Sequence, residues 1–147
     1  MLKGRILSVD FGLKRIGLAV SDPLQVIASP LENLEAGRSP KASAERLVKH
    51  LETLKEKGYR IEAIVIGLPL HMSGKESERS QLVRQFKECV EALSALPVEL
   101  FDERLSSIQA ERALIETGFS RKKRSEVVDR VSAQIVLQTY LAQRGPR

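Results

Sequence analysis

The sequence has little that would support base recognition by stacking or a fold held by disulfides. It contains no tryptophan, 4% of its residues are aromatic, and its one cysteine is Cys89. Base stacking needs aromatic side chains, so it is a poor candidate binding mode. A single cysteine cannot form an internal disulfide, which suits a reducing compartment. Because Phe86, Val90 and Leu93 surround it at helical spacing, we expect a buried helical thiol.

Long apolar segments are also missing. No apolar run approaches the length of a bilayer span, and the N-terminus lacks the apolar core of a signal peptide. We therefore expect a cytoplasmic protein with no membrane contact. The 147 residues show no repeat, low-complexity segment or domain boundary, so residues 1–147 are expected to form a single domain.

Positive charge is in mild excess. Lys and Arg number 24 against 19 Asp and Glu, for a net charge of +5, which favours a polyanionic partner without requiring one. For the consecutive cations 121–124, a solvated basic loop is an equally good interpretation. The candidate phosphate-binding residues are Lys14, Arg15, Arg104, Arg121, Lys122, Lys123 and Arg124.

Five segments have the pattern of strands. The continuous apolar run 61–68 is typical of a parallel strand that is covered on both faces. Pro30 interrupts another segment and confines it to a sheet edge, because proline cannot donate a ladder hydrogen bond. The expected strands are 6–9, 16–21, 26–34, 61–68 and 97–101.

Four segments have the pattern of helices. Ser39 and Pro40 suit an N-cap and a first helical position, and Gly58 is a stop signal. The remaining helices are expected at 82–93, from the Ser106 capping box to Gly118, and, after a Ser125 cap, at 126–142.

The order of these elements predicts the architecture. Early strands that are close in sequence form antiparallel hairpins, whereas later strands that alternate with helices join in parallel through right-handed crossovers. We therefore expect an α/β protein with a mixed five-stranded sheet, in which three early strands are antiparallel and helices pack on the faces.

Acidic residues lie where the ends of these elements converge. Asp10 ends the first strand, Asp102 and Glu103 end the last one, and Asp129 lies in a nearly all-apolar helix. Each has a simpler interpretation: Asp10 as a turn aspartate, Asp102 or Glu103 as a partner of Arg104, and Asp129 as a first-turn residue favoured by the helix dipole. Alternation alone does not say whether Asp102 or Glu103 points toward a site.

Together the acids have the pattern of a metal-dependent nuclease. Carboxylates on adjacent strand ends, about 4.8 Å apart, can share hard cations such as Mg²⁺. Two ions about 3.5–4 Å apart would bracket a scissile phosphate.

Four blocks of the sequence stand out, in the order Asp10–Asp22, Gly67–Gly74, Asp102–Ser107 and Asp129–Leu141. Together these blocks resemble the bacterial YqgF family of pre-16S rRNA nucleases. The family is related to Holliday junction resolvases within the ribonuclease H-like superfamily. In the third block Ser106-Ser107 stands where Thr-Thr is usual, which keeps a hydroxyl cap.

The resemblance implies a ribonuclease H-like fold and a catalytic Mg²⁺ or Mn²⁺ site made by Asp10, Glu103 and Asp129. It favours Glu103 over Asp102, which becomes a supporting neighbour. It also implies an endonuclease that trims the 5′ end of pre-16S rRNA in ribosome biogenesis, with structured RNA and ribosomal particles as partners. His71 stands where asparagine is more common; we expect an ordinary loop histidine rather than a ligand of water or phosphate.

Three other functions stay open at this point. A Holliday junction resolvase would cut branched DNA as a two-fold dimer, so both a monomer and a homodimer are considered. An ATP-binding protein of the actin and sugar-kinase type needs two such domains, and this chain has room for one. A non-catalytic RNA-binding ribosome-assembly factor would hold three acids that repel phosphate unless a metal is present.

Overall fold

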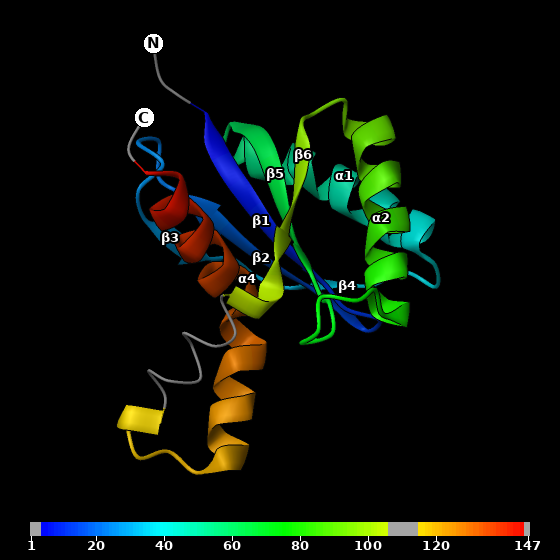
Figure 1. The fold of residues 1–147 in the computed structure, drawn as a ribbon. Coiled ribbons are helices and arrows are strands. Elements are labelled where there is room, and N and C mark those ends of the chain that lie inside the picture. The colour runs from blue at the N-terminus through cyan, green and yellow to red at the C-terminus, as the bar shows by residue number, and fades with distance from the viewer. Residues whose placement is uncertain (1–3, 106–114, 146–147) are drawn as a thin grey trace.

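The structure, a computed structural model, describes residues 4–105 and 115–145, and for residues 125–130 it describes the backbone alone. Its centre is a six-stranded mixed sheet with the order β3-β2-β1-β5-β6, in which β4 also pairs with β2 (Figure 1). The pairs among β1 to β4 are antiparallel, and β1, β5 and β6 are parallel. The strands are β1 (Arg5–Phe11), β2 (Arg15–Ser21), β3 (Ala28–Pro30), β4 (Leu34–Glu35), β5 (Ile61–Leu68) and β6 (Val98–Asp102).

The predicted mixed sheet is confirmed, but the single strand expected at 26–34 is wrong. That segment forms two short strands, β3 and β4, which pair with opposite ends of β2. Pro30 ends β3 because it has no N–H with which to continue the ladder. The sheet therefore has six strands rather than five, and β3 lies at its edge as predicted.

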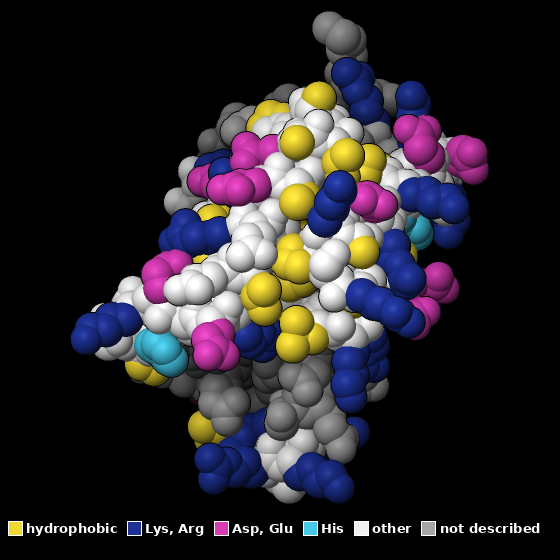
Figure 2. All heavy atoms as spheres, turned by 90° about the vertical axis from the view of Figure 1, so that its right-hand side faces the viewer, with side chains coloured by type: hydrophobic (Ala, Val, Ile, Leu, Met, Phe, Trp, Pro, Cys, Tyr) yellow, Lys and Arg dark blue, Asp and Glu magenta, His cyan; other side chains and the backbone are white. Residues whose placement is uncertain are grey.

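Helices α1 (Pro40–Glu56) and α2 (Glu78–Ser94) cover one face of the sheet (Figure 1). Ser39 caps α1 by accepting a hydrogen bond from the Ala42 amide at 3.1 Å, and Gly58 follows the helix with a φ of +93°. Both signals were predicted and are confirmed. The outer side of these helices carries interspersed Lys, Arg, Asp and Glu side chains (Figure 2), which suits a solvent-exposed surface.

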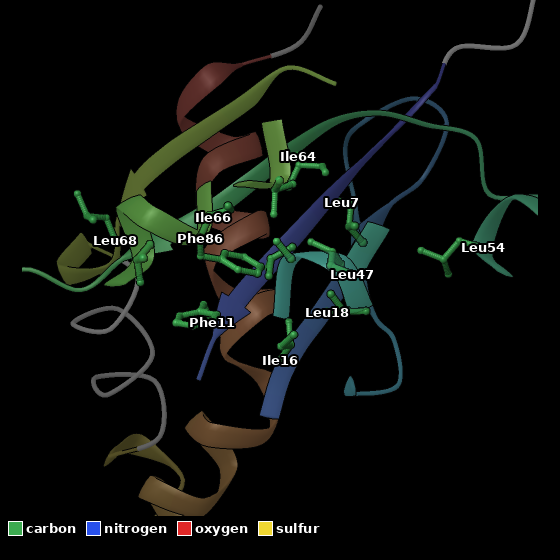
Figure 3. Close-up of a cluster of buried hydrophobic side chains, with 14 residues drawn as sticks. Leu7, Phe11, Ile16, Leu18, Leu47, Leu54, Ile64, Ile66, Leu68 and Phe86 are labelled. Atoms are coloured by element: carbon green, nitrogen blue, oxygen red, sulfur yellow. The ribbon is translucent and has the colours of Figure 1, made fainter. Parts of the chain in front are cut away.

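The core beneath α1 and α2 contains apolar side chains from both helices and from β1, β2 and β5 (Figure 3). The rings of Phe11 and Phe86 stack with centroids 4.5 Å apart, which ties the end of β1 to α2. Ile64 and Ile66 of β5 are buried in this core, whereas Val65 is buried in the core on the opposite face. This confirms the prediction that β5 is covered on both sides.

Helix α4 (Arg121–Arg144) packs against the opposite face of the sheet, which we call the α4 face. Ala133, Val136, Leu137 and Leu141 are buried there against the sheet. The helix begins earlier than predicted, since Ser120 is its N-cap and accepts a hydrogen bond from the Lys123 amide at 3.2 Å. The cations expected to lie in a loop therefore occupy its first turn, despite the unfavourable helix dipole.

Other expectations on the helices have mixed outcomes. The helix predicted between Ser106 and Gly118 falls mostly on residues outside the described ranges. Cys89 on α2 is partly buried beside the first core, rather than fully buried as expected. Among the described helices, none has both the length and the apolar character that crossing a bilayer requires.

Candidate functional site

Asp10 lies on the α4 face near the end of β1. Side chains alternate along a strand, so Ile6, Ser8 and Asp10 share one face. Ile6 is buried against α4, and the Ser8 hydroxyl donates a hydrogen bond to the Ala133 carbonyl at 2.8 Å. Opposite Asp10 in the register is Gly17 of β2, where an added Cβ would lie in ordinary contact with the Asp10 and Ala133 side chains. The fold therefore directs the first predicted carboxylate toward α4.

Glu103 follows β6, and its side chain approaches Asp10 across β5, which lies between β1 and β6 in the sheet. A Cβ added to Gly67, at the end of β5, would lie 2.9 Å from Glu103 Oε1, so this glycine makes room for the carboxyl group. The Glu103 side chain also shares a hydrogen bond with Asp10. The ends of three parallel strands thus bring two of the predicted acids into contact across a glycine.

Electrostatics at this pair favour a cation. Burial raises the pKa of Glu103 to about 8, and the negative charge of Asp10 and the hydrogen bond to it act in the same direction. The charge of Arg79 opposes this increase. In the metal-free protein the pair therefore retains a proton near neutral pH. Oxygen donors that repel each other in this way fit a divalent cation, whose charge would allow both to ionise.

Asp102 and Arg104 form a separate ion pair beside the site. The Arg104 Nε lies 3.0 Å from both carboxylate oxygens of Asp102, and Nη2 lies 2.5 Å from Oδ2. Hydrogen bonding by Arg104 lowers the pKa of Asp102. Arg104 Nη1 also donates to the Met72 carbonyl at 3.1 Å. The predicted phosphate-binding residue Arg104 is thus engaged with Asp102 and with the loop before α2.

Asp129 is the third predicted acid, and its side chain lies outside the described residues. Its backbone is on α4, about one turn before Ala133. The Ala133 Cβ lies 3.8 Å, and the Asp10 Cβ 3.5 Å, from the position that a Cβ on Gly17 would take. Helix α4 therefore passes close to Asp10. Among the described side chains, no group of three metal-ligating residues converges.

The other predicted cations lie at the same end of the sheet or project beyond it. Lys14 and Arg15 are exposed in and after the turn that joins β1 to β2. The side chains of residues 121–123 are exposed in the first turn of α4. Figure 2 shows Lys and Arg side chains at the lower end of the molecule, where α4 begins in Figure 1.

Arg79 was not predicted from the sequence, although it lies beside the pair. Its Nη2 donates to the carbonyl of Phe11, the residue after Asp10, at 3.1 Å. In the sequence it has the pattern of an ordinary surface residue of α2, and no motif distinguished it. His71, in contrast, is an exposed loop residue whose backbone closes a tight turn with Gly74 and Lys75.

Known proteins resemble this chain over nearly its whole length. The family described as "RuvX: Holliday junction resolvase" matches residues 4–143. The chain belongs to the RuvX family. A "Putative pre-16S rRNA nuclease" of Protochlamydia amoebophila is 46% identical, over 95% of this chain and 94% of that protein. One with the same description from Koribacter versatilis is 44% identical, over 97% and 89%.

Solved structures support the fold. RuvC of Thermus thermophilus, in complex with a Holliday junction substrate, has a TM-score of 0.54 and 18% sequence identity, and the match covers 96% of this chain and 95% of that one. At this identity the similarity concerns the fold alone. The predicted family, the ribonuclease H-like fold and the nuclease class are thereby confirmed for this RuvX-family chain.

Proposed function

We propose that this chain is a metal-dependent endonuclease that processes the 5′ end of pre-16S rRNA. The observation that carries the proposal is the Asp10–Glu103 pair. The two carboxyl groups share a hydrogen bond and the pKa of Glu103 is raised, which indicates a site where a bound cation would be stabilising. The names of relatives more than 40% identical over nearly the whole chain support the choice of substrate.

Asp10, Glu103 and Asp129 would hold Mg²⁺ or Mn²⁺. Carboxylate oxygens are the ligands these hard cations prefer, and Glu103 could release its proton when a cation offsets the charge of Asp10. A bound divalent ion would supply Lewis-acid stabilisation of the charge that develops on the scissile phosphate. Gly67 keeps space for the Glu103 carboxyl group, and the rigid strand ends hold both described acids in place.

The cations outside the pair would position the substrate rather than cut it. Lys14, Arg15 and residues 121–124 would contact phosphates of structured RNA near the cleavage point, and the exposure of Lys14, Arg15 and residues 121–123 supports this role. Arg104 would act indirectly, by holding the loop at Met72 against the strand end that carries Glu103. Such an enzyme would work in the cytoplasm on precursor ribosomal particles, as part of ribosome biogenesis.

Holliday junction cleavage is the second candidate function, because the family description names it. Structured RNA and four-way DNA present similar phosphate patterns, so the same site would serve either substrate. A resolvase needs two active sites related by a two-fold axis, whereas trimming one RNA end needs one. The oligomeric state on the substrate therefore separates the two functions.

The deciding experiment compares two labelled substrates, a 5′-extended 16S rRNA precursor fragment and a four-way DNA junction, with Mg²⁺ or Mn²⁺. Asp10→Asn removes the charge at the site. Asp22→Asn is the matched control, because Asp22 follows β2 at the opposite end of the sheet and accepts hydrogen bonds from the Val26 and Ile27 amides. RNA cleavage that Asp10→Asn abolishes and Asp22→Asn retains supports the proposal. Paired symmetric cuts in DNA support the resolvase, and binding without cleavage supports an assembly factor.

A further inference from the structure

The N-terminal capping box of α2 holds Arg79 near the end of β1. The Ser77 hydroxyl accepts a hydrogen bond from the Ser80 amide at 3.0 Å, and the Ser77 amide donates to the Ser80 hydroxyl at 2.7 Å. Ser77 also donates to the Pro69 carbonyl at 2.8 Å, which ties the helix start to the end of β5. This capping box fixes the first turn of α2 beside the strand ends, and Arg79 is part of that turn.

From this turn the side chain crosses to β1. Its Nη2 donates to the Phe11 carbonyl at 3.1 Å, so the guanidinium is anchored one residue beyond Asp10. The same guanidinium is close enough to Glu103 for its charge to act on that carboxyl group. Arg79 therefore lies at the edge of the Asp10–Glu103 pair, hydrogen-bonded to β1 and close enough to Glu103 for its charge to act there.

Its contacts distinguish Arg79 from the neighbouring arginines. Arg104 is bound to Asp102 and to the Met72 carbonyl, and Arg84 forms a 2.6 Å ion pair with Glu76. In the described part of the chain, Arg79 forms no ion pair, and its one side-chain hydrogen bond goes to a neutral carbonyl. It is also exposed, so its remaining donors face solvent beside the site.

We propose that Arg79 binds the phosphate that approaches the Asp10–Glu103 pair, as a substrate-contacting residue. The proposal rests on the proposed function, because it takes this pair as the place where nucleic acid is bound. A guanidinium is a planar fork that binds two phosphate oxygens at once, and the Phe11 contact fixes its orientation beforehand. Its charge also offsets the repulsion between an incoming phosphate and the two acids.

The first test measures binding without cleavage, so that it does not depend on catalysis. Affinity for the labelled precursor RNA and for the four-way junction is measured in EDTA over a range of salt concentrations. Arg79→Gln keeps a donor for Phe11 but loses the charge. We expect its affinity to fall about tenfold and the slope of log K against log salt to fall by about 0.7–0.9, the contribution of one phosphate.

Two variants control this measurement. Arg79→Lys keeps the charge and should retain the salt slope, although it loses the bidentate geometry. Arg84→Gln removes another arginine of the same helix and should leave the slope unchanged, because Glu76 already compensates its charge. Thermal unfolding of each variant shows whether the fold is intact. A folded Arg79→Gln protein with the wild-type slope overturns the proposal, and so does a wild-type protein that binds neither nucleic acid.

The second test is single-turnover cleavage with saturating enzyme and Mg²⁺ or Mn²⁺. Arg79→Gln should lower the rate about 10²-fold, since it removes a donor aimed at the reacting phosphate. If wild-type protein binds in an Arg79-dependent way but cuts nothing, the proposed function fails and the role of Arg79 stands. If Arg79→Gln binds and cuts like wild type, the role of Arg79 fails and the proposed function stands.

Discussion

Asp102 and Glu103 are consecutive acids at the end of β6, but their surroundings shift their pKa values in opposite directions. Asp102 is paired with Arg104, which lowers its pKa, whereas burial and Asp10 raise the pKa of Glu103 to about 8. The first acid stabilises the folded chain as it stands. The second is held next to a like charge, an arrangement that costs stability without a cation and is typical of functional sites.

The largest expected difference between the two acids is in catalysis. Glu103→Gln should lower the cleavage rate about 10³-fold, because it removes a charge needed at the reacting phosphate. Asp102→Asn should lower it about tenfold, since it only loosens Arg104 and the loop at Met72. Single-turnover cleavage of both variants measures the contrast. Equal losses would mean that the two acids do not have separate roles.

The two acids should also differ in their effect on stability. Glu103→Gln is expected to lower the cleavage rate but to raise the free energy of unfolding. The pKa of Glu103 is above its ordinary 4.5, so its stabilising effect is complete below that value and is lost as pH rises through about 8. Glu103→Gln should therefore stabilise the metal-free protein at pH 8 by an amount of the order of 2 kcal/mol. Urea unfolding in EDTA at pH 5 and pH 8 measures this.

Asp102 is the control for that measurement. Its pKa is lowered, so its stabilising effect is present above the ordinary 3.8 and is lost as pH falls through the lower folded value. Asp102→Asn should destabilise the protein at both pH values, by about 1 kcal/mol. If Glu103→Gln were also destabilising at pH 8, the contrast between the two acids would be refuted.

A smaller effect should follow from filling the space next to Glu103. In Gly67→Ala the new Cβ would meet Glu103 Oε1 at 2.9 Å, and the flexible end of the glutamate would swing away. We expect about a tenfold loss of cleavage with little change in stability. Gly17→Ala is the matched control on the same face, because its Cβ would meet Asp10 and Ala133 at 3.5–3.8 Å, which is ordinary contact. Similar activity losses in both variants would argue against a specific role for Gly67.

The smallest expected effect concerns the cations that begin α4. Lys122→Gln should reduce the salt slope of RNA binding by about 0.7–0.9 and raise stability by about 0.3 kcal/mol, because a cation in the first turn opposes the helix dipole. Lys55→Gln removes a cation from the last turn of α1, where the dipole favours it. It should slightly destabilise the protein and leave the slope unchanged. An unchanged slope in Lys122→Gln would remove this residue from the binding surface.

Local signals predicted much of the fold. Ser39, Pro40 and Gly58 mark the ends of α1 by hydrogen bonding and backbone preference, and the run 61–68 matches β5. One error arose where tertiary contacts overrode the local pattern, since β2 pairs with two short strands around Pro30. The other was a choice between two local signals, because Ser120 rather than Ser125 caps α4, ahead of its four cations.

The site was less accessible from sequence than the fold. Asp10 was identified by its place at a strand end, but alternation could not say which of Asp102 and Glu103 faces it, because no local signal labels the two sides of a sheet. Arg79 was missed because its role depends on the distance between α2 and β1, residues far apart in the chain. The metal-ligand role of all three acids stays a prediction.

The most direct test of the central claim is a titration of the Glu103 side-chain carboxyl carbon by ¹³C NMR, with and without Mg²⁺. In the metal-free protein we predict a pKa of about 8, which Asp10→Asn should lower because it removes the opposing charge. Saturating Mg²⁺ should shift the apparent pKa below the ordinary 4.5, since a bound cation favours the ionised form. A pKa near 4.5 that neither Mg²⁺ nor Asp10→Asn changes would contradict the assignment of this pair as a metal site.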